Sequence, residues 1–312
     1  MDKLDEKIFK ELDINPKIPL SKLARKLNIS QQVVDYRLKN MLNKKIISKL
    51  ATIINLKSLG LEHYRIFFTF NSKKKDSNHE IFNYLKNKKG VYWAARIGGR
   101  YDLHIVLFVK NFEEFDKFFD DFNIAFPGLI KDYKSCYVID HLIYKHKYLS
   151  KEYSAIEYGY NDKLKEIDDL DYYILNNIKD NCRLSALELS KGKNVSYKTI
   201  INRTKQLEKR NVILGYRTFL KQMKEKPFLL LFSFKDYSRK IEKDLISYLA
   251  RRDEITQTLR LFGIWNLYIH VRMEDNEKLQ NLIIKLRDKF DIIDDYEIMP
   301  IFEDISINLL PV

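Results

Sequence analysis

The side chains best suited to reading a base sequence lie in one short segment, residues 30–42. A glutamine can hydrogen-bond adenine through two atoms, and a lysine can bond to guanine or to phosphate. If the segment is helical, Val34, Leu38 and Met41 share one face and the polar side chains occupy the other. The polar candidates are Ser30, Gln31, Gln32, Asp35, Tyr36, Arg37 and Lys39, followed by Lys44, Lys45 and Lys49. The last three suit phosphate contacts, which set affinity and register but not sequence specificity.

Two earlier helices would position this segment. Apolar residues recur at helical spacing over residues 4–12 and again over residues 20–27. Asn15-Pro16 ends the first helix, because the residue before a proline is disfavoured in the α conformation. Residues 28–30 then form a tight turn in which Ser30 can cap the next helix. Two helices joined by such a turn, followed by a short β wing over residues 46–54, are typical of a helix-turn-helix that enters a major groove.

Amphipathic three-helix units also occur as purely structural domains. Residues 1–60, however, carry 13 basic and 6 acidic residues, a net charge of +7. The whole chain carries +13, and residues 1–150 hold 28 basic residues against 17 acidic ones. Basic charge concentrated around a polar helix favours double-stranded DNA as the partner.

The chain repeats itself. A shift of 166 residues gives ten identities over residues 4–50 without a gap, among them Asn28 with Asn194, Ser30 with Ser196 and Arg37 with Arg203. The second set of candidate DNA contacts is Tyr197, Lys198, Asn202, Arg203 and Lys205. Gly192-Lys193 interrupts the helix before this segment, and Thr204 replaces a core leucine. We therefore expect the second reader to be weaker or to have a different sequence preference.

An α/β pattern follows each helical part. Strands are predicted at 66–70, 91–97, 103–109 and 133–144, with helices near 81–85 and 112–122, and residues 228–310 repeat this order. The order β-α-β-β-α-β is that of a ferredoxin-like domain, whose sheet has one bare face that requires a partner. The predicted fold class is α+β. Winged helix-turn-helix domains at 1–60 and 166–225 each precede a ferredoxin-like domain, at 61–149 and 226–312, with residues 150–165 as linker. We expect the two α/β domains to pair as a pseudo-dimer.

The sequence offers little for other kinds of chemistry. Cys136 and Cys182 form no Cys-x-x-Cys pair, and the six histidines show no metal-binding spacing, so we expect no metal and no cofactor. His104 lies in a predicted strand and is expected to have a satisfied core or interface role. The acidic N-terminus lacks an apolar targeting segment, and no run is long enough to span a membrane, which favours a cytoplasmic protein.

The ordered set of motifs resembles the Lrp/AsnC (feast/famine) regulators. It comprises the opening Leu4-Asp5-Glu6-Lys7-Ile8, the helix-turn-helix to Leu38, and the turn Gly99-Arg100-Tyr101-Asp102. The resemblance implies DNA binding through the first domain, homo-oligomers, and in many members an amino-acid effector. It would place Gly99, Arg100 and Asp102 near the effector, although the second copy reads Gly263-Ile264-Trp265-Asn266 and lacks the carboxylate.

Two other functions remain open. One is an enzyme resembling the siroheme decarboxylases, which are built on a similar scaffold, and the other is a protein- or RNA-binding adaptor. The preferred interpretation is a non-enzymatic, sequence-specific transcription regulator with two different readers, responsive to a small effector such as an amino acid.

Overall fold

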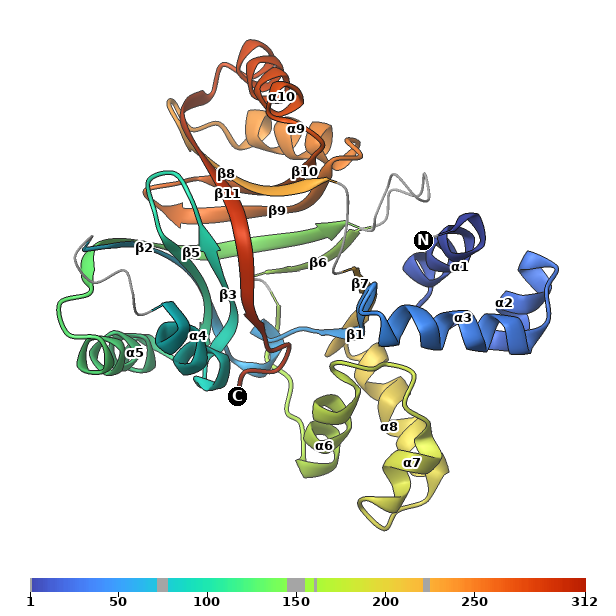
Figure 1. Cartoon of the computed structure of the whole chain (residues 1–312). Coiled ribbons are helices and arrows are strands. Elements are labelled where there is room, and N and C mark those ends of the chain that lie inside the picture. Colours follow the sequence, from blue (N-terminus) through green and yellow to red (C-terminus); the bar gives the residue numbers. More distant parts are fainter. Residues whose placement is uncertain (1, 72–77, 145–154, 160–161, 221–224) are drawn as a thin grey trace. The chain divides into compact units, whose positions relative to one another are not determined.

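The computed structural model describes residues 2–71, 78–144, 155–159, 162–220 and 225–312. The chain is α+β and divides into two compact units, each of which combines parts of both repeats (Figure 1). The first unit holds residues 1–55, 145–156 and 165–223, and the second holds residues 56–144, 157–164 and 224–312. The two helix-turn-helix domains thus share one unit, and the two α/β domains share the other.

In the helical unit, the elements of the first repeat are α1 (Lys3–Ile14), α2 (Leu20–Leu27), α3 (Gln31–Asn43) and β1 (Ile47–Ile54). Those of the second repeat are α6 (Asp169–Ile178), α7 (Ala186–Lys191), α8 (Tyr197–Lys209) and β7 (Ile213–Leu220). Ser30 and Ser196 cap α3 and α8, each accepting a hydrogen bond from the amide three residues later. The apolar stripes of α1, α2 and α3 form one core, as the helical spacing predicts.

The strand after α3 connects the two repeats. Residues 47–54 form one continuous strand in place of the expected local wing, and β1 pairs antiparallel with β7 of the other repeat. The contacts are reciprocal: the Thr52 hydroxyl donates to the Ile178 carbonyl at 2.7 Å, and the Thr218 hydroxyl donates to the Leu12 carbonyl at 2.9 Å. These threonines are 166 residues apart, so the two helix-turn-helix domains are joined with pseudo-two-fold symmetry.

In the α/β unit, a short 3-10 helix, η1 (Lys57–Leu59), precedes the first domain. The elements of that domain are β2 (Glu62–Phe70), α4 (Asn78–Asn87), β3 (Val91–Ile97), β4 (Leu103–Val109), α5 (Phe112–Ala125) and β5 (Ile130–Tyr144). Those of the second domain are β8 (Lys226–Phe234), α9 (Arg239–Ala250), β9 (Ile255–Gly263), β10 (Leu267–Met273), α10 (Asn276–Lys289) and β11 (Ile293–Ile307). Each domain has the predicted βαββαβ order, and an apolar core lies between its helices and its sheet.

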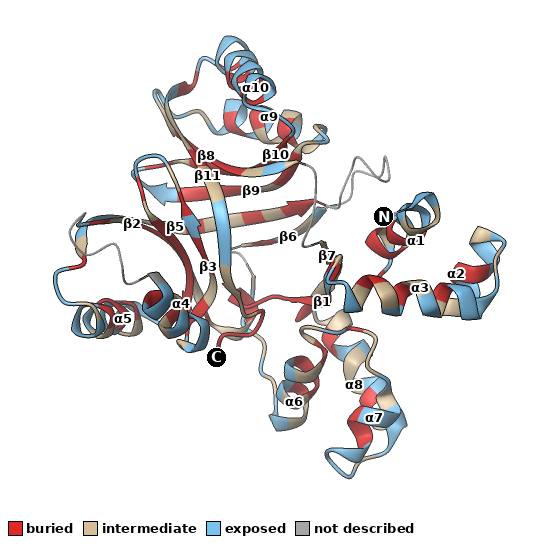
Figure 2. Cartoon of the chain, in the orientation of Figure 1, coloured by how far each residue is buried: buried red, intermediate tan, exposed pale blue. Residues whose placement is uncertain are grey.

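The two sheets join into a closed ring of eight strands. The strand order is β2-β4-β3-β11-β8-β10-β9-β5, and the additional pairing of β2 with β5 closes the ring. A further cluster of buried apolar residues, which includes Phe67, Leu231 and Met299, comes from strands of both domains. Figure 2 shows buried residues along the strands of this barrel. The predicted pseudo-dimer of α/β domains is therefore confirmed. The predicted linker contains β6 (Ala155–Gly159), which extends the sheet beyond β5, while residues 150–154 and 160–161 lie outside the described residues.

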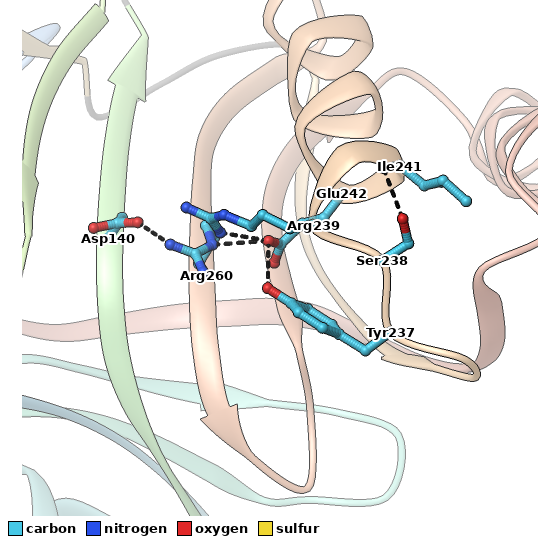
Figure 3. Close-up of polar contacts among 7 residues, drawn as sticks. All are labelled: Asp140, Tyr237, Ser238, Arg239, Ile241, Glu242 and Arg260. Atoms are coloured by element: carbon cyan, nitrogen blue, oxygen red, sulfur yellow. Dashed lines mark hydrogen bonds and ion pairs between the residues drawn. The ribbon is translucent and has the colours of Figure 1, made fainter.

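The two junctions between the repeats differ in charge. At the β5–β9 junction, the buried Arg260 forms ion pairs with Asp140 and with Glu242, the latter at 3.1 Å (Figure 3). Arg239 and the Tyr237 hydroxyl also bind Glu242, at 2.5 Å and 2.9 Å. At the equivalent β3–β11 junction, the pair that corresponds to Arg260, Arg96 with Glu303, is exposed and its closest atoms are 3.9 Å apart. Among the described residues, no helix is long and apolar enough to cross a membrane.

Candidate nucleic-acid interface

Helix α3 presents the polar face that its sequence predicts. Gln31 and Gln32 are exposed at its N-terminal end, and the Tyr36 side chain is 71% exposed. Val34, Leu38 and Met41 are buried in the core. Lys39 extends from the same surface but forms an ion pair with Asp35, one turn earlier, at 2.7 Å. Amide and phenol groups therefore dominate the face that would meet a base edge, and Asp35 partly neutralises the charge of Lys39.

The two arginines predicted to contact DNA are held by the first helix of each repeat. The Arg37 guanidinium lies 2.5 Å from an Asp2 carboxylate oxygen and 2.9 Å from one of Asp5. The hydrogen bond from Arg37, with those from the amides of Asp5 and Leu4, lowers the Asp2 pKa to about 2. Arg203 likewise pairs with Asp168, and with Asp171 at 3.6 Å. Arg37 thus connects α3 to the start of α1, and Arg203 connects α8 to the start of α6.

Sequence reasoning missed the acidic partners of these arginines. Asp5 and Asp171 are the aspartates of the repeated Leu-Asp-x-x-Ile opening, and Asp2 and Asp168 cap the first helices. The signal was present in the sequence, because both acids and the arginine recur at the same shift of 166 residues. A charge that recurs with its partner indicates a contact within each repeat.

Helix α8 presents a more basic face than α3. Its exposed side chains are Tyr197, Lys198, Asn202 and Lys205. Among the described residues, neither Lys198 nor Lys205 has an acidic partner. Thr204, at the position of a core leucine, directs its hydroxyl back to the Ile200 carbonyl at 2.8 Å. The helix therefore accommodates Thr204, and its exposed face carries Lys198 and Lys205.

The end of α7 differs from that of α2 for a packing reason. Helix α7 spans six residues against eight in α2. A side chain at Gly192 would meet the Tyr173 hydroxyl at 2.1 Å, and that hydroxyl donates to the Leu189 carbonyl at 3.2 Å. Tyr173 thus occupies the space that a side chain at position 192 would need.

The basic residues after α3 have different surroundings. Lys44 and Lys45 are exposed just beyond the helix end, where a phosphate could reach them. Lys49 lies on β1, and its ammonium group is 2.5 Å from a carboxylate oxygen of Asp180. Lys49 therefore contributes to the contact between the two repeats.

The turn predicted to lie near an effector packs against the opposite repeat. Gly99 has φ +89°, and a β-carbon there would approach the Ile298 carbonyl oxygen of β11 to 2.8 Å. Gly263 has φ +144°, and a β-carbon there would come within 3.2 Å of Cys136 of β5. The exposed Arg100 lies 3.4 Å from a Glu297 carboxylate oxygen, and Asp102 accepts a hydrogen bond from the Phe70 amide at 2.8 Å. The glycines of both turns are thus required by contacts between the repeats.

Comparisons with known proteins identify both helix-turn-helix domains. Residues 1–42 match the AsnC-type helix-turn-helix domain, and residues 167–213 match a winged helix-turn-helix DNA-binding family. The HTH-type transcriptional regulator Ptr1 of Methanocaldococcus jannaschii is 30% identical over 118 residues, which cover 38% of this chain and 78% of that protein. The leucine-responsive regulatory protein of Haemophilus influenzae is 27% identical over 138 residues, covering 43% and 81%.

A solved structure matches nearly the whole chain. The siroheme decarboxylase NirDL, in complex with an iron-uroporphyrin III analogue, superposes with a TM-score of 0.67 over 97% of this chain and 92% of that protein. The two sequences are 14% identical, so this likeness concerns the fold. The relatives and the helix-turn-helix domains point to one family. The chain belongs to the Lrp/AsnC family, with the family's helix-turn-helix and α/β unit present twice in one polypeptide.

Proposed function

We propose that this chain is a sequence-specific DNA-binding transcription regulator with two non-identical readers. The observation that carries the proposal is the pair of serine-capped helices α3 and α8, each with an exposed polar face, in one compact unit. Their side chains differ at most positions: Gln32 stands where the second repeat has Lys198, and Tyr36 where it has Asn202. The preferred DNA site would therefore be asymmetric, since only identical readers require a palindrome.

Within this proposal, the readers contact DNA through side chains that the structure leaves exposed. On α3 these are Gln31, Gln32, Tyr36 and Lys39, with Lys44 and Lys45 on phosphates, and on α8 they are Tyr197, Lys198, Asn202 and Lys205. Arg37 and Arg203 act as positioning residues, because their guanidinium groups already bind aspartates. An amino-acid effector would bind on the exposed side of the turn at Gly99 and Arg100. The Asp102 carboxylate already accepts the Phe70 amide.

A fluorescence-anisotropy titration tests the proposal. The full chain is titrated against a pool of randomised duplexes at two salt concentrations, and the retained DNA is sequenced. We expect salt-sensitive binding that enriches an asymmetric motif, with Gln32→Ala and Lys39→Ala each weakening it. No binding at low salt would reject the regulator, and enrichment of RNA or of a protein partner in parallel assays would point to an adaptor.

A second candidate function is supported by the match of NirDL to nearly the whole chain. An enzyme of that kind would bind a tetrapyrrole. An absorbance scan of the protein mixed with an iron tetrapyrrole tests this directly, because binding shifts the intense visible bands. A shift at stoichiometric concentration would favour the enzyme, and unchanged bands would leave the regulator as the proposed function.

A further inference from the structure

A charged side chain lies inside the eight-stranded barrel. Arg65 is on β2 and is only 4% exposed. Side chains alternate along a strand, so His63, Arg65 and Phe67 point to the same side of β2. Phe67 belongs to the apolar cluster inside the barrel, together with Tyr268 of β10. The Arg65 guanidinium is therefore in the barrel interior.

This guanidinium has no counter-charge within the described ranges of the chain. Among the residues that the structure describes, Arg65 has no ion pair and its side chain has no hydrogen bond, and its buried Nε atom is unpartnered. The guanidinium carbon lies 4.7 Å from the centre of the Tyr268 ring, and the face of an aromatic ring attracts a cation without neutralising it. A buried cation is ordinarily paired with an anion, because removing it from water is costly.

Two imidazoles near Arg65 are also unpartnered. His63 and His104 are 1% and 0% exposed, and the described part of the chain provides no hydrogen-bond partner for the ring nitrogens of either. His104 pairs with Phe67 across β2 and β4, which makes it a diagonal neighbour of Arg65. His63 stacks on Phe108 at 4.2 Å and His104 stacks on Phe67 at 4.4 Å, so both rings are fixed in orientation. His104 thus has the expected buried position, but its ring nitrogens have no hydrogen-bond partner among the described residues.

Burial lowers the pKa of both His63 and His104 well below the usual histidine range, and the charge of Arg65 lowers both further. Each imidazole is therefore neutral, with one N–H group to donate and one nitrogen to accept. Two neutral donors beside a guanidinium form a set that suits a negatively charged acceptor.

The second repeat shows that the barrel does not require these groups. With the shift of 164 residues that aligns the α/β domains, Leu229 stands at the position of Arg65, Pro227 at that of His63 and Tyr268 at that of His104. Leu229 is fully buried in the same interior core. An apolar side chain therefore satisfies the fold at this position, and the charge in the first repeat calls for another explanation.

We propose that the barrel interior binds a small monovalent anion, held by the Arg65 guanidinium and by N–H groups of His63 and His104. The ligand carries one negative charge and accepts hydrogen bonds, as a halide or a short carboxylate such as formate does. Buried water would satisfy the hydrogen bonds but would leave the charge of Arg65 uncompensated. The inference is independent of DNA binding.

Thermal unfolding of the full chain tests this inference. Sodium chloride and sodium formate are titrated separately, with ionic strength held constant by sodium gluconate, a bulky carboxylate. We expect the melting temperature of the wild type to rise by roughly 5 °C and to saturate, since a ligand that binds only the folded state stabilises it. Arg65→Met should abolish the rise, and Arg96→Met, which alters an exposed arginine of the same sheet, should keep it. A rise with only one of the two salts identifies the source of the anion.

A bromide-soaked crystal of the wild type decides the case even if Arg65→Met does not fold. We expect an anomalous peak within hydrogen-bonding distance of Arg65 and of one or both imidazoles. Density for water alone at this position, together with equal responses of the wild type and Arg65→Met to both salts, would overturn the inference.

Discussion

The Asp102 carboxylate and the Asn266 side-chain amide make the same hydrogen bond in the two α/β domains. Each accepts from a backbone amide at the end of the neighbouring strand, Phe70 for Asp102 and Phe234 for Asn266, and both distances are 2.8 Å. The backbone amides of the two residues also make equivalent bonds, to the Phe68 and Phe232 carbonyls. The turn therefore requires an oxygen acceptor at this position, and a neutral one serves as well as a charged one.

This equivalence predicts how Asp102 responds to substitution. Asp102→Asn should leave the free energy of unfolding nearly unchanged, whereas Asp102→Ala should lower it by about 1–2 kcal/mol, because the Phe70 amide loses its acceptor. Urea denaturation measures both. Equal losses in the two variants would show that the turn requires the negative charge of Asp102 and not only an oxygen acceptor.

The unequal junctions of the barrel provide a second prediction with a built-in control. The Glu242 side chain is 3% exposed and binds Arg260 and Arg239, so Glu242→Ala leaves a buried guanidinium without one of its partners. Unfolding should become easier by about 3 kcal/mol. Glu303→Ala removes the exposed partner of Arg96 at the equivalent junction and should change stability by less than about 0.5 kcal/mol.

Chemical denaturation compares the two junction variants. Losses of similar size would mean that burial does not distinguish the junctions. A stable Glu242→Ala protein would mean that Asp140 alone compensates Arg260.

The sequence predicts local elements well and long-range partners poorly. Strands β3 and β4 have the predicted bounds, because continuous apolar runs end at clear turns. Strand β2 begins at Glu62 rather than at the predicted Ile66, since His63 and Arg65 are polar side chains that the barrel interior buries. Alternation along a strand records which face is buried but not which strand lies beside it. The pairing of β1 with β7 and the presence of β6 in the linker were therefore not predictable.

The same limit applies to the candidate site. The polar face of α3 follows from helical periodicity, and Gln31, Gln32 and Tyr36 lie on it as predicted. Arg37 belongs to the same periodic pattern, yet its guanidinium binds acids of another helix. Spacing within one helix carries no information about a partner some thirty residues earlier in the chain, although the repeated sequence does.

The Arg37 contact predicts an unusual titration of Asp2. The pKa of Asp2 should be about 2, against an ordinary value of 3.8, because Arg37 and two backbone amides stabilise the carboxylate. A lowered pKa means that the contact stabilises the fold fully above about pH 4 and that this contribution is lost as the pH falls through about 2. Carbon-detected NMR of the Asp side chains measures the value.

Arg37→Gln should return the Asp2 pKa toward its ordinary value, and Arg203→Gln, the equivalent change in the second repeat, should leave it low. An Asp2 pKa near 3.8 in the wild type would contradict the contact between Arg37 and Asp2 in solution.

The lysines of the two reader helices predict different contributions to DNA binding. Lys198 and Lys205 have no acidic partner among the described residues, whereas Lys39 is paired with Asp35. A free lysine that meets a phosphate releases a counterion on binding, so each such contact steepens the dependence of affinity on salt. Lys198→Ala and Lys205→Ala should each weaken binding of the selected duplex and lower the salt slope by about 1.

Lys39→Ala should change the slope less, because Asp35 already neutralises that charge, and Lys285→Ala on α10 serves as the matched control. Anisotropy titrations over a series of salt concentrations give both affinity and slope. If the α8 variants bind like the control while Gln32→Ala does not, the second reader makes no phosphate contact, and the chain reads DNA through α3 alone.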